Sequence, residues 1–136
     1  MAELDCEILT PEGRVFEGRA EMVVVPGSDG ELGVLPRHAP IIARLKVGEV
    51  RVRFEGNTWR SWAINEGYFK MQFDRAMVLV EDAVAATDID VEKARADADD
   101  ARARLAEAQG GDSELDRYRA ERDLLYAENR IAIAGR

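Results

Sequence analysis

The residue types that most often carry acid–base or nucleophilic chemistry are scarce in this chain, which holds one histidine, His38, and one cysteine, Cys6. A triad built on His38 would need a positioned nucleophile and a buried acid, and no motif identifies either of them. The chain also lacks the nucleophile elbow and the zinc-protease motif, and its glycines near Gly30 follow neither G-x-G-x-x-G nor the phosphate-loop pattern. We therefore expect no catalytic residue and no metal site, with an enzyme built on a β-sandwich as an open alternative.

Cys6 and His38 are instead expected to have structural roles. A single cysteine cannot form an internal disulfide and has no second cysteine for a metal site, so Cys6 is predicted to be a small core residue in a reducing compartment. His38 lies between Arg37 and Ala39-Pro40. We predict that it is a loop residue that makes local hydrogen bonds, and contact with a partner is the alternative.

The segment that positions His38 is rich in residues that fix the backbone. From Gly27 to Pro40 it contains three glycines and two prolines. Glycine permits positive φ and close approach of the backbone, whereas proline locks φ and removes a hydrogen-bond donor. The segment is therefore predicted to be a shaped turn with a short strand inside it.

The size and charge of the chain limit its possible functions. Its 136 residues suffice for one good core, or for one compact domain with a small appendage. The formal charge of −8 argues against nucleic-acid binding, which needs clustered Lys and Arg, and favours neutral or basic protein partners. The N-terminus has no signal-peptide pattern and no apolar run could cross a bilayer, so we expect a soluble, unexported protein.

The first part of the chain has the pattern of an all-β domain. Short apolar runs separated by turn residues extend from Leu4 to about Ala85, and the clearest strands are residues 20–25, 49–54 and 76–80. In residues 49–54 the valines alternate with arginines, as in a sheet with one solvated face. The turn residues divide the region into about nine or ten strands, which is typical of a sandwich.

Two tryptophans test this strand pattern. Trp59 and Trp62 are three positions apart in a strand that follows the predicted turn Glu55-Gly56-Asn57. Successive side chains of a strand point to opposite faces, so the two indoles should lie on opposite sides of the sheet. We expect at least one of them in the core.

The chain becomes helical beyond Thr87, where Ala, Glu, Asp, Arg and Leu dominate. Thr87 or Asp88 is predicted to cap the first helix. The apolar positions then recur every three or four residues, as in a coiled-coil seam: Val91, Ala94, Ala98, Ala101, Leu105 and Ala108. Residues 109–113 are predicted to end this helix and to cap a second one.

The expected fold is therefore α+β, with an all-β sandwich over residues 1–86 and an antiparallel two-helix hairpin over residues 87–136. An alanine seam buries little apolar area, so the hairpin should be only marginally stable unless it packs against another surface. The simplest interpretation of its arginines and aspartates is that they form a solvent-exposed face with weak ion pairs. Contact between the arginines and the acidic surface of a larger assembly is the alternative.

The central segment also carries a family resemblance. The pattern G-x-x-G-x-L-G-x-L-P-x-H-A-P, followed by Ile41-Ile42-Ala43, resembles the signature of the ε subunit of rotary ATP synthases, and the order of a β domain and a helical hairpin resembles that family over essentially the whole chain. The resemblance implies a non-catalytic rotor subunit of the central stalk. It would couple proton-driven rotation of the c-ring to the catalytic head.

The resemblance also implies partners and a location. The sandwich would bind the γ subunit and touch the c-ring, and Glu31, Arg37 and His38 would lie on the loop end that faces the ring. The hairpin would fold onto the sandwich or extend along γ toward the α/β head, where it would inhibit ATP hydrolysis. The protein would be peripheral, on the cytoplasmic face of a bacterial membrane, with the chloroplast thylakoid as the alternative.

Some members of that family bind ATP at the hairpin through I/L-D-x-x-R-A and further arginines. The corresponding residues here are Ile89, Asp90, Lys93 and, in the second helix, Arg130. Lysine replaces the motif arginine and loses its planar fork, while Asp100 and Tyr126 stand where further arginines would help. We therefore expect no cofactor, and Asp90 with Lys93 are then a helix-start pair.

Three other functions remain open beside the rotor subunit. A nucleotide-sensing module would bind ATP at the hairpin with measurable affinity. An enzyme would need a pocket with convergent polar groups. An adaptor with a sandwich and a coiled-coil tail would differ only in its partner.

Overall fold

The computed structural model describes residues 2–108 and 113–136. The chain divides into two compact units, Met1–Ala85 and Ala86–Arg136. The first unit contains ten strands: β1 (Leu4–Thr10), β2 (Gly13–Ala20), β3 (Met22–Gly27), β4 (Gly30–Val34), β5 (Ile41–Leu45), β6 (Gly48–Phe54), β7 (Thr58–Ile64), β8 (Gly67–Gln72), β9 (Arg75–Val80) and β10 (Ala83–Ala85). This result confirms the predicted number of strands.

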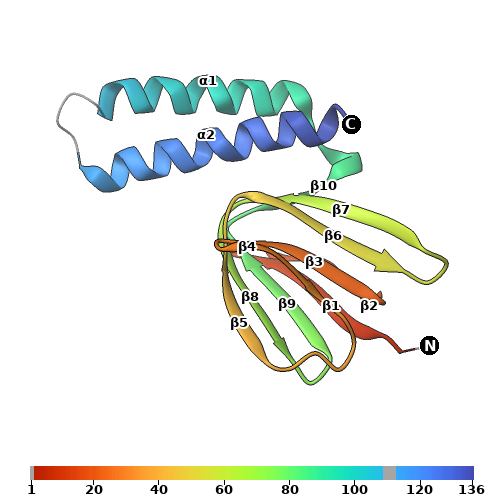
Figure 1. The fold of residues 1–136 in the computed structure, drawn as a ribbon. Coiled ribbons are helices and arrows are strands. Elements are labelled where there is room, and N and C mark those ends of the chain that lie inside the picture. Colours follow the sequence, from red (N-terminus) through yellow and green to blue (C-terminus); the bar gives the residue numbers. More distant parts are fainter. Residues whose placement is uncertain (1, 109–112) are drawn as a thin grey trace. The chain divides into compact units, whose positions relative to one another are not determined.

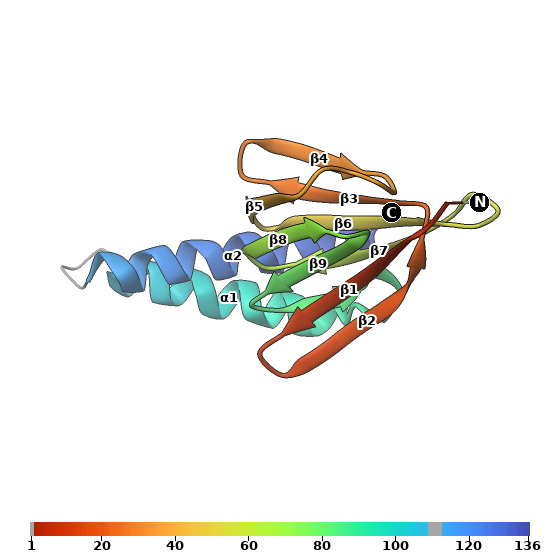
Figure 2. The same cartoon turned by 90° about the horizontal axis from the view of Figure 1, so that it is seen from below.

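The strands form one strongly curved sheet in the order β10-β7-β6-β3-β5-β8-β9-β1-β2, and β4 pairs with β3 outside this path. Neighbouring strands are antiparallel except for β1 and β9, which are parallel. Figures 1 and 2 show how the sheet folds over so that its two halves face each other across a common interior. The first unit is therefore the predicted sandwich.

Large apolar side chains from both halves fill this interior. Phe69 and Ile8 are fully buried, and Trp62 is 1% exposed. The ring of Phe16 on β2 lies 4.6 Å from the ring of Trp62 on β7, which joins two strands near opposite ends of the sheet order. Trp59 is 43% exposed, so the two tryptophans lie on opposite faces as predicted.

The glycines of the central segment shape its path. Gly27 and Gly30 flank the turn between β3 and β4. Gly30 has a φ of +134°, and a Cβ on Gly27 would lie 2.6 Å from the carbonyl oxygen of Gly30. Neither position accommodates an ordinary side chain without strain or a clash. The short strand predicted inside the segment is β4.

The second unit contains a short 3₁₀ turn, η1 (Ala86–Asp88), and two helices, α1 (Val91–Ala108) and α2 (Glu114–Ala134). The predicted cap of α1 was wrong, because Thr87 and Asp88 belong to the 3₁₀ turn. Asp90 caps the helix instead: its Oδ1 accepts a hydrogen bond from the Lys93 backbone N at 3.1 Å, and its carbonyl accepts one from the Ala94 backbone N at 3.0 Å.

The cap of α2 agrees with the prediction. The Ser113 hydroxyl accepts a hydrogen bond from the Asp116 backbone N at 3.1 Å. Residues 109–112, where the end of the first helix was predicted, lie outside the described residues. Neither described helix combines the length and the hydrophobicity needed to cross a membrane.

Small side chains line the interior of the hairpin. The helices run antiparallel, because Asp97 contacts Arg130 and Arg104 contacts Asp123 farther along α1. Alanines of both helices are buried between them: Ala94, Ala98, Ala101, Ala108, Ala120 and Ala127. Val91 and Leu105 of the predicted seam are half-buried. The second unit is the predicted hairpin, and the two units together confirm the α+β fold.

Candidate partner interfaces

The loop that carries Arg37 and His38 lies beside the β8–β9 turn at the lower end of the sandwich in Figure 1. The backbone N of Arg37, whose φ is +69°, donates to Asp74 Oδ1 at 2.6 Å. The backbone N of His38 donates to the Leu35 carbonyl at 3.1 Å, and its Nδ1 lies 2.7 Å from the Ala39 carbonyl oxygen. These contacts confirm the prediction that His38 is a loop residue with local hydrogen bonds.

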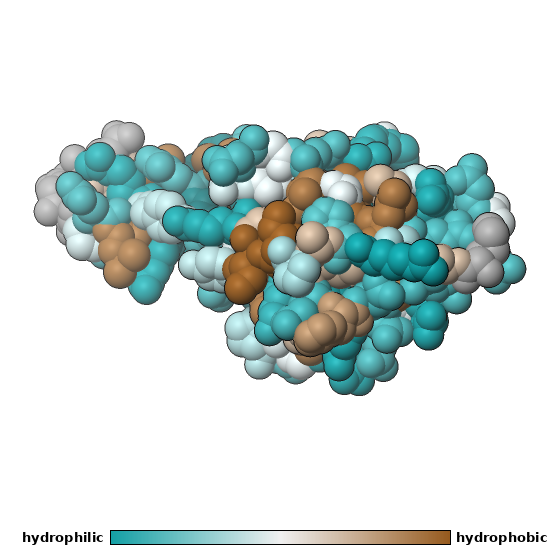
Figure 3. Space-filling view, turned by 60° about the horizontal axis from the view of Figure 1, so that its bottom comes forward, coloured by the Kyte–Doolittle hydropathy of each residue, from teal (hydrophilic) through white to brown (hydrophobic). Residues whose placement is uncertain are grey.

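Apolar side chains project from this end of the sandwich and from the neighbouring strands. Phe73 is 86% exposed in the β8–β9 turn, and Leu35 is 50% exposed in the loop beside it. Ile42 on β5 and Tyr68 on β8 are also exposed. Figure 3 shows hydrophobic side chains that interrupt an otherwise hydrophilic surface. Grouped apolar side chains of this kind are typical of a surface that contacts another protein.

Phe73 also has an unfavourable backbone conformation. Its φ is +52°, in the left-handed region that bulky residues rarely adopt. The adjacent Asp74 has a φ of +56° and receives the hydrogen bond from Arg37. An exposed aromatic side chain held in a strained turn contributes little to the core, so the core does not explain its conformation.

Glu31 lies apart from Arg37 and His38. It follows the Gly27–Gly30 turn, whereas Arg37 follows the opposite end of β4. Both carboxylate oxygens of Glu31 contact Arg51 Nη2, at 3.1 and 3.2 Å. The structure therefore brings Arg37 and His38 together, but not Glu31 with them.

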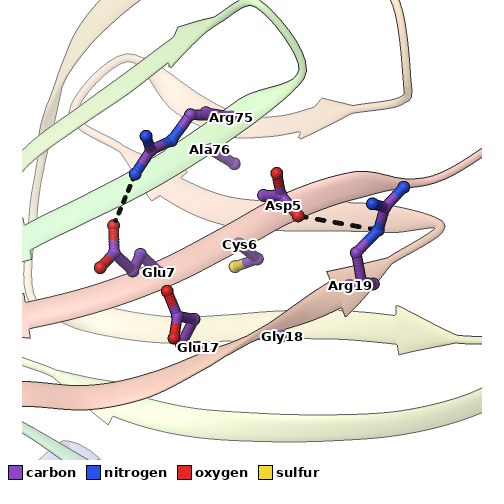
Figure 4. Close-up of a pocket in the computed structure, with 8 residues that line it drawn as sticks. All are labelled: Asp5, Cys6, Glu7, Glu17, Gly18, Arg19, Arg75 and Ala76. Carbon is purple, nitrogen blue, oxygen red and sulfur yellow. Dashed lines mark hydrogen bonds and ion pairs between the residues drawn. The ribbon is translucent and has the colours of Figure 1, made fainter.

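A hollow of about 440 Å³ lies over β1, β2 and β9 (Figure 4), and its charged side chains form ion pairs with one another or with the neighbouring Arg14. Glu7 Oε2 accepts from Arg14 Nε at 2.9 Å, and Glu7 Oε1 accepts from Arg75 Nη2 at 3.2 Å. Arg19 Nε lies 3.6 Å from Asp5 Oδ1. The residues that line the hollow are Asp5, Cys6, Glu7, Glu17, Gly18, Arg19, Arg75 and Ala76.

This hollow offers no nucleophile. Burial, assisted by the charge of Glu7, raises the pKa of Cys6 to about 12, so the thiol stays protonated near neutral pH. Cys6 is 1% exposed, as predicted for a core residue. Across residues 2–108 and 113–136, no group of three or more His, Cys, Asp or Glu side chains is placed to hold a metal ion.

The nucleotide candidates of the hairpin lie in one region but are engaged with other groups. Asp90 caps α1, and Ile89 is half-buried just before it. Lys93 Nζ donates to Asp97 Oδ2 at 2.9 Å, and Arg130 Nη2 donates to the same oxygen at 3.0 Å. Lys93 and Arg130 therefore meet through a carboxylate of the chain itself.

Sequence reasoning missed this role of Asp97. Its partial burial acts to raise its pKa, but the hydrogen bonds and charges of Lys93 and Arg130 prevail and hold that pKa below the usual value. The pair of Lys93 and Asp97 could have been found from its i, i+4 spacing. The contact with Arg130 depends on the register of the two helices, for which the sequence has no local signal.

A second ion pair also joins the helices. Arg104 Nη2 donates to Asp123 Oδ2 at 2.9 Å, and this hydrogen bond raises the pKa of Arg104. Arg102 and Arg104 also pair with carboxylates on α1 itself. The polar face of the hairpin is thus laced with ion pairs, as the simpler interpretation of its charges predicted.

Two family models match consecutive parts of the chain. Residues 3–86 match the β-sandwich domain of the ATP synthase delta/epsilon chain, and residues 87–135 match its long α-helix domain. Among curated proteins, the ATP synthase epsilon chain of Halalkalibacterium halodurans is 41% identical over 136 residues, with 100% of both chains covered. That of Desulforamulus reducens is 44% identical over 128 residues, with 94% of each chain covered.

Solved structures share the fold. A chain in the structure of the Euglena gracilis mitochondrial ATP synthase, comprising OSCP, F1 and the c-ring, superimposes with a TM-score of 0.75 at 22% identity. The match covers 97% of this chain and 81% of the other. A chain of the Tetrahymena thermophila mitochondrial ATP synthase central stalk and c-ring gives a TM-score of 0.57 at 11% identity.

Proposed function

Because this chain belongs to the ATP synthase delta/epsilon chain family, we propose that it is a non-catalytic rotor subunit of the central stalk of an F-type ATP synthase. In this role it couples rotation of the c-ring to the catalytic head. The observation that carries the proposal is the similarity over the whole length of the chain to proteins named ATP synthase epsilon chain. A non-catalytic role also suits a chain that has one histidine and one cysteine, the latter buried.

The sandwich provides the anchor in this proposal. It binds the γ subunit and contacts the c-ring, with Glu31, Arg37 and His38 as contact residues. The exposed Leu35 in the Arg37 loop and the exposed Phe73 in the neighbouring turn support a protein contact at that end. Glu31 lies at the other end of β4 and therefore belongs to a separate part of the contact surface. Attachment to the membrane is indirect, through the complex on its cytoplasmic face.

The hairpin acts as the brake on ATP hydrolysis through contact with the α/β head. Its thin, alanine-lined interior supports this role, because a helix pair that buries little apolar area can rearrange at low cost. We do not propose the nucleotide-sensing alternative, since Asp97 already holds both Lys93 and Arg130.

The test is ATP hydrolysis by a reconstituted α, β and γ head with the full chain or with a version that ends at Ala86. The core cluster of the sandwich draws its members from residues up to Ala85, so the shortened chain retains it. We expect both versions to bind γ and the full chain alone to suppress hydrolysis. Failure of both to bind γ would contradict the rotor assignment and favour an adaptor.

A substitution at Phe73 tests the sandwich end in a separate assay, assembly with a complex that contains the c-ring. Asn tolerates the left-handed conformation of position 73 better than Phe does, so Phe73→Asn should not destabilise the fold. We expect weaker assembly with the c-ring complex at unchanged melting temperature. Unchanged assembly would place the contact elsewhere on the sandwich.

A further inference from the structure

Two cations of the hairpin converge on a single carboxylate oxygen. Asp97 Oδ2 accepts from Lys93 Nζ on the same helix at 2.9 Å and from Arg130 Nη2 on the facing helix at 3.0 Å. Arg130 is 7% exposed, and its guanidinium lies 4.4 Å from the centroid of the Tyr126 ring. A cation that is buried to this degree needs an anion within reach, and here the chain supplies it.

The same groups would suit an anionic ligand. A guanidinium stacked on an aromatic ring, with an ammonium group opposite, binds carboxylate or phosphate oxygens. Asp97 places its own oxygen between these two groups. A free anion that bridges the same two groups would have to displace it and break both ion pairs.

We infer that Asp97 is a built-in anionic ligand that joins α1 to α2, so that the hairpin closes without a nucleotide. The inference concerns the hairpin of the isolated chain. It rests on the proposed function only for the further step that closure of the hairpin regulates ATP hydrolysis. It predicts that the unmodified chain is closed in the absence of ATP and does not respond to it. Removal of the carboxylate exposes Lys93 and Arg130 to anions from solution and makes closure depend on them.

The experiment uses the full chain with Cys6→Ala and spin labels at positions 103 and 121, which are exposed on α1 and α2. Interhelical distances and calorimetric titrations are recorded with ATP and with inorganic tripolyphosphate. Asp97→Ala is the test variant, and Asp99→Ala is its matched control. The Asp99 side chain is 81% exposed and pairs with Arg102 at 3.2 Å on the same helix. Each substitution replaces aspartate by alanine and raises the helix propensity of α1 by the same amount. A difference between the two variants in helix distance or anion binding therefore reports on the contacts of Asp97.

We expect one narrow distance distribution for the unmodified chain and for Asp99→Ala, unchanged by either anion. Asp97→Ala should broaden the distribution, and either anion should narrow it again with an affinity at least about tenfold above that of the unmodified chain. Adding Arg130→Gln should abolish that binding. If Asp97→Ala loses helicity altogether, Asp97→Asn keeps the shape without the charge and should show the same response.

Two results would overturn the inference. One is closure of the unmodified hairpin by millimolar ATP. The other is an Asp97→Ala or Asp97→Asn hairpin that stays closed and binds no anion. Both readouts use the isolated chain, so they are independent of the γ binding and hydrolysis assays that test the proposed function.

Discussion

The interiors of the sandwich and the hairpin are built from different side chains. Trp62, Phe69 and Ile8 lie among the large apolar groups buried in the sandwich. The buried residues of the hairpin are mainly alanines, joined by Tyr126 and Ile133, and Arg130 pairs with Asp97 across the two helices. Full burial of a large apolar side chain contributes about 1.5–3 kcal/mol, whereas an alanine contributes far less. The sandwich is therefore held mainly by the burial of large apolar side chains, whereas the hairpin depends more on close fit and charge pairing.

This difference suits the two proposed roles. An anchor must keep its shape while it transmits force, and a well-packed core resists local opening. A brake must change its conformation at small cost. We expect the two units to differ in stability and to respond to different perturbations.

The largest effect is expected from removing the Trp62 side chain. This change should lower the stability of the sandwich and leave that of the hairpin unchanged. Trp62→Ala removes a side chain that is 1% exposed and should destabilise the sandwich by about 3–5 kcal/mol. Trp59 remains as a fluorescent reporter of the sandwich, because both tryptophans belong to that unit. In a denaturant titration the fluorescence midpoint should fall while the helical circular dichroism keeps its midpoint.

Trp59→Ala is the control, because its side chain is 43% exposed and should cost little. If Trp62→Ala shifts the fluorescence and the helical transition equally, the two units unfold as one and the comparison fails.

Cys6 should give the sandwich a weakness at alkaline pH. Its folded pKa of about 12 lies above the unfolded value of about 8.5. A group with a raised folded pKa contributes stability below its unfolded pKa and loses it as pH rises through the folded pKa. The sandwich should therefore lose a few kcal/mol between about pH 8.5 and 12.

Cys6→Ala should remove this alkaline slope, as measured by tryptophan fluorescence in denaturant at several pH values. The native thiol should also resist modification at mildly alkaline pH. Rapid labelling of the folded chain would show that Cys6 is accessible and that burial does not control its ionisation.

The sequence predicted the sandwich in more detail than the hairpin, for a physical reason. Alternation along a strand is local, so the opposite faces of Trp59 and Trp62 followed from their spacing. The shaped segment from Gly27 to Pro40 followed from its glycines and prolines. The parallel pairing of β1 with β9 joins segments far apart in the chain, and no local pattern specifies it.

In the hairpin too, the features that the sequence did not predict depend on contacts beyond the local pattern, both at the start of α1 and between the two helices. Several residues near the start of α1 could cap it, and the 3₁₀ turn at Ala86–Asp88 determines that Asp90 does so. The contact of Asp97 with Arg130 requires the register of two helices that are joined by residues 109–113. Within the candidate interface, Arg37 and His38 could be placed on one loop, but the separation of Glu31 depends on the length and direction of β4.

A smaller effect is expected when a side chain is added to the hairpin seam. Ala98 is 2% exposed between the helices, so Ala98→Leu should force them apart and cost about 1–3 kcal/mol. Leucine and alanine have similar helix propensities, so the change reports on packing. Thermal melting followed by circular dichroism should show the loss, with the tryptophan fluorescence of the sandwich unchanged.

Ala106→Leu on the exposed side of α1 is the control and should have little effect. A gain in stability from Ala98→Leu would mean that the seam has unfilled space. The close-fit description of the hairpin would then be wrong.

The smallest expected effect concerns Asp97, which should make the hairpin sensitive to acid where Cys6 makes the sandwich sensitive to base. Partial burial opposes ionisation, but Lys93 and Arg130 outweigh it and lower the folded pKa of Asp97. A carboxylate of this kind contributes stability above its unfolded pKa of about 3.9 and loses it as pH falls through the lower folded value. The Asp97 side chain is 38% exposed, so its share should not exceed about 1 kcal/mol.

Asp97→Asn should therefore lower hairpin stability at neutral pH and match the unmodified chain in acid, as measured by helical circular dichroism during thermal melting. Asp99→Asn should change little at either pH, because the exposed Asp99 pairs with Arg102 of its own helix. If the difference between Asp97→Asn and the unmodified chain persists below about pH 3, side-chain shape rather than charge stabilises this site. In that case the Asp97 site is held by packing, as the sandwich core is, and the contrast between the two units is one of degree.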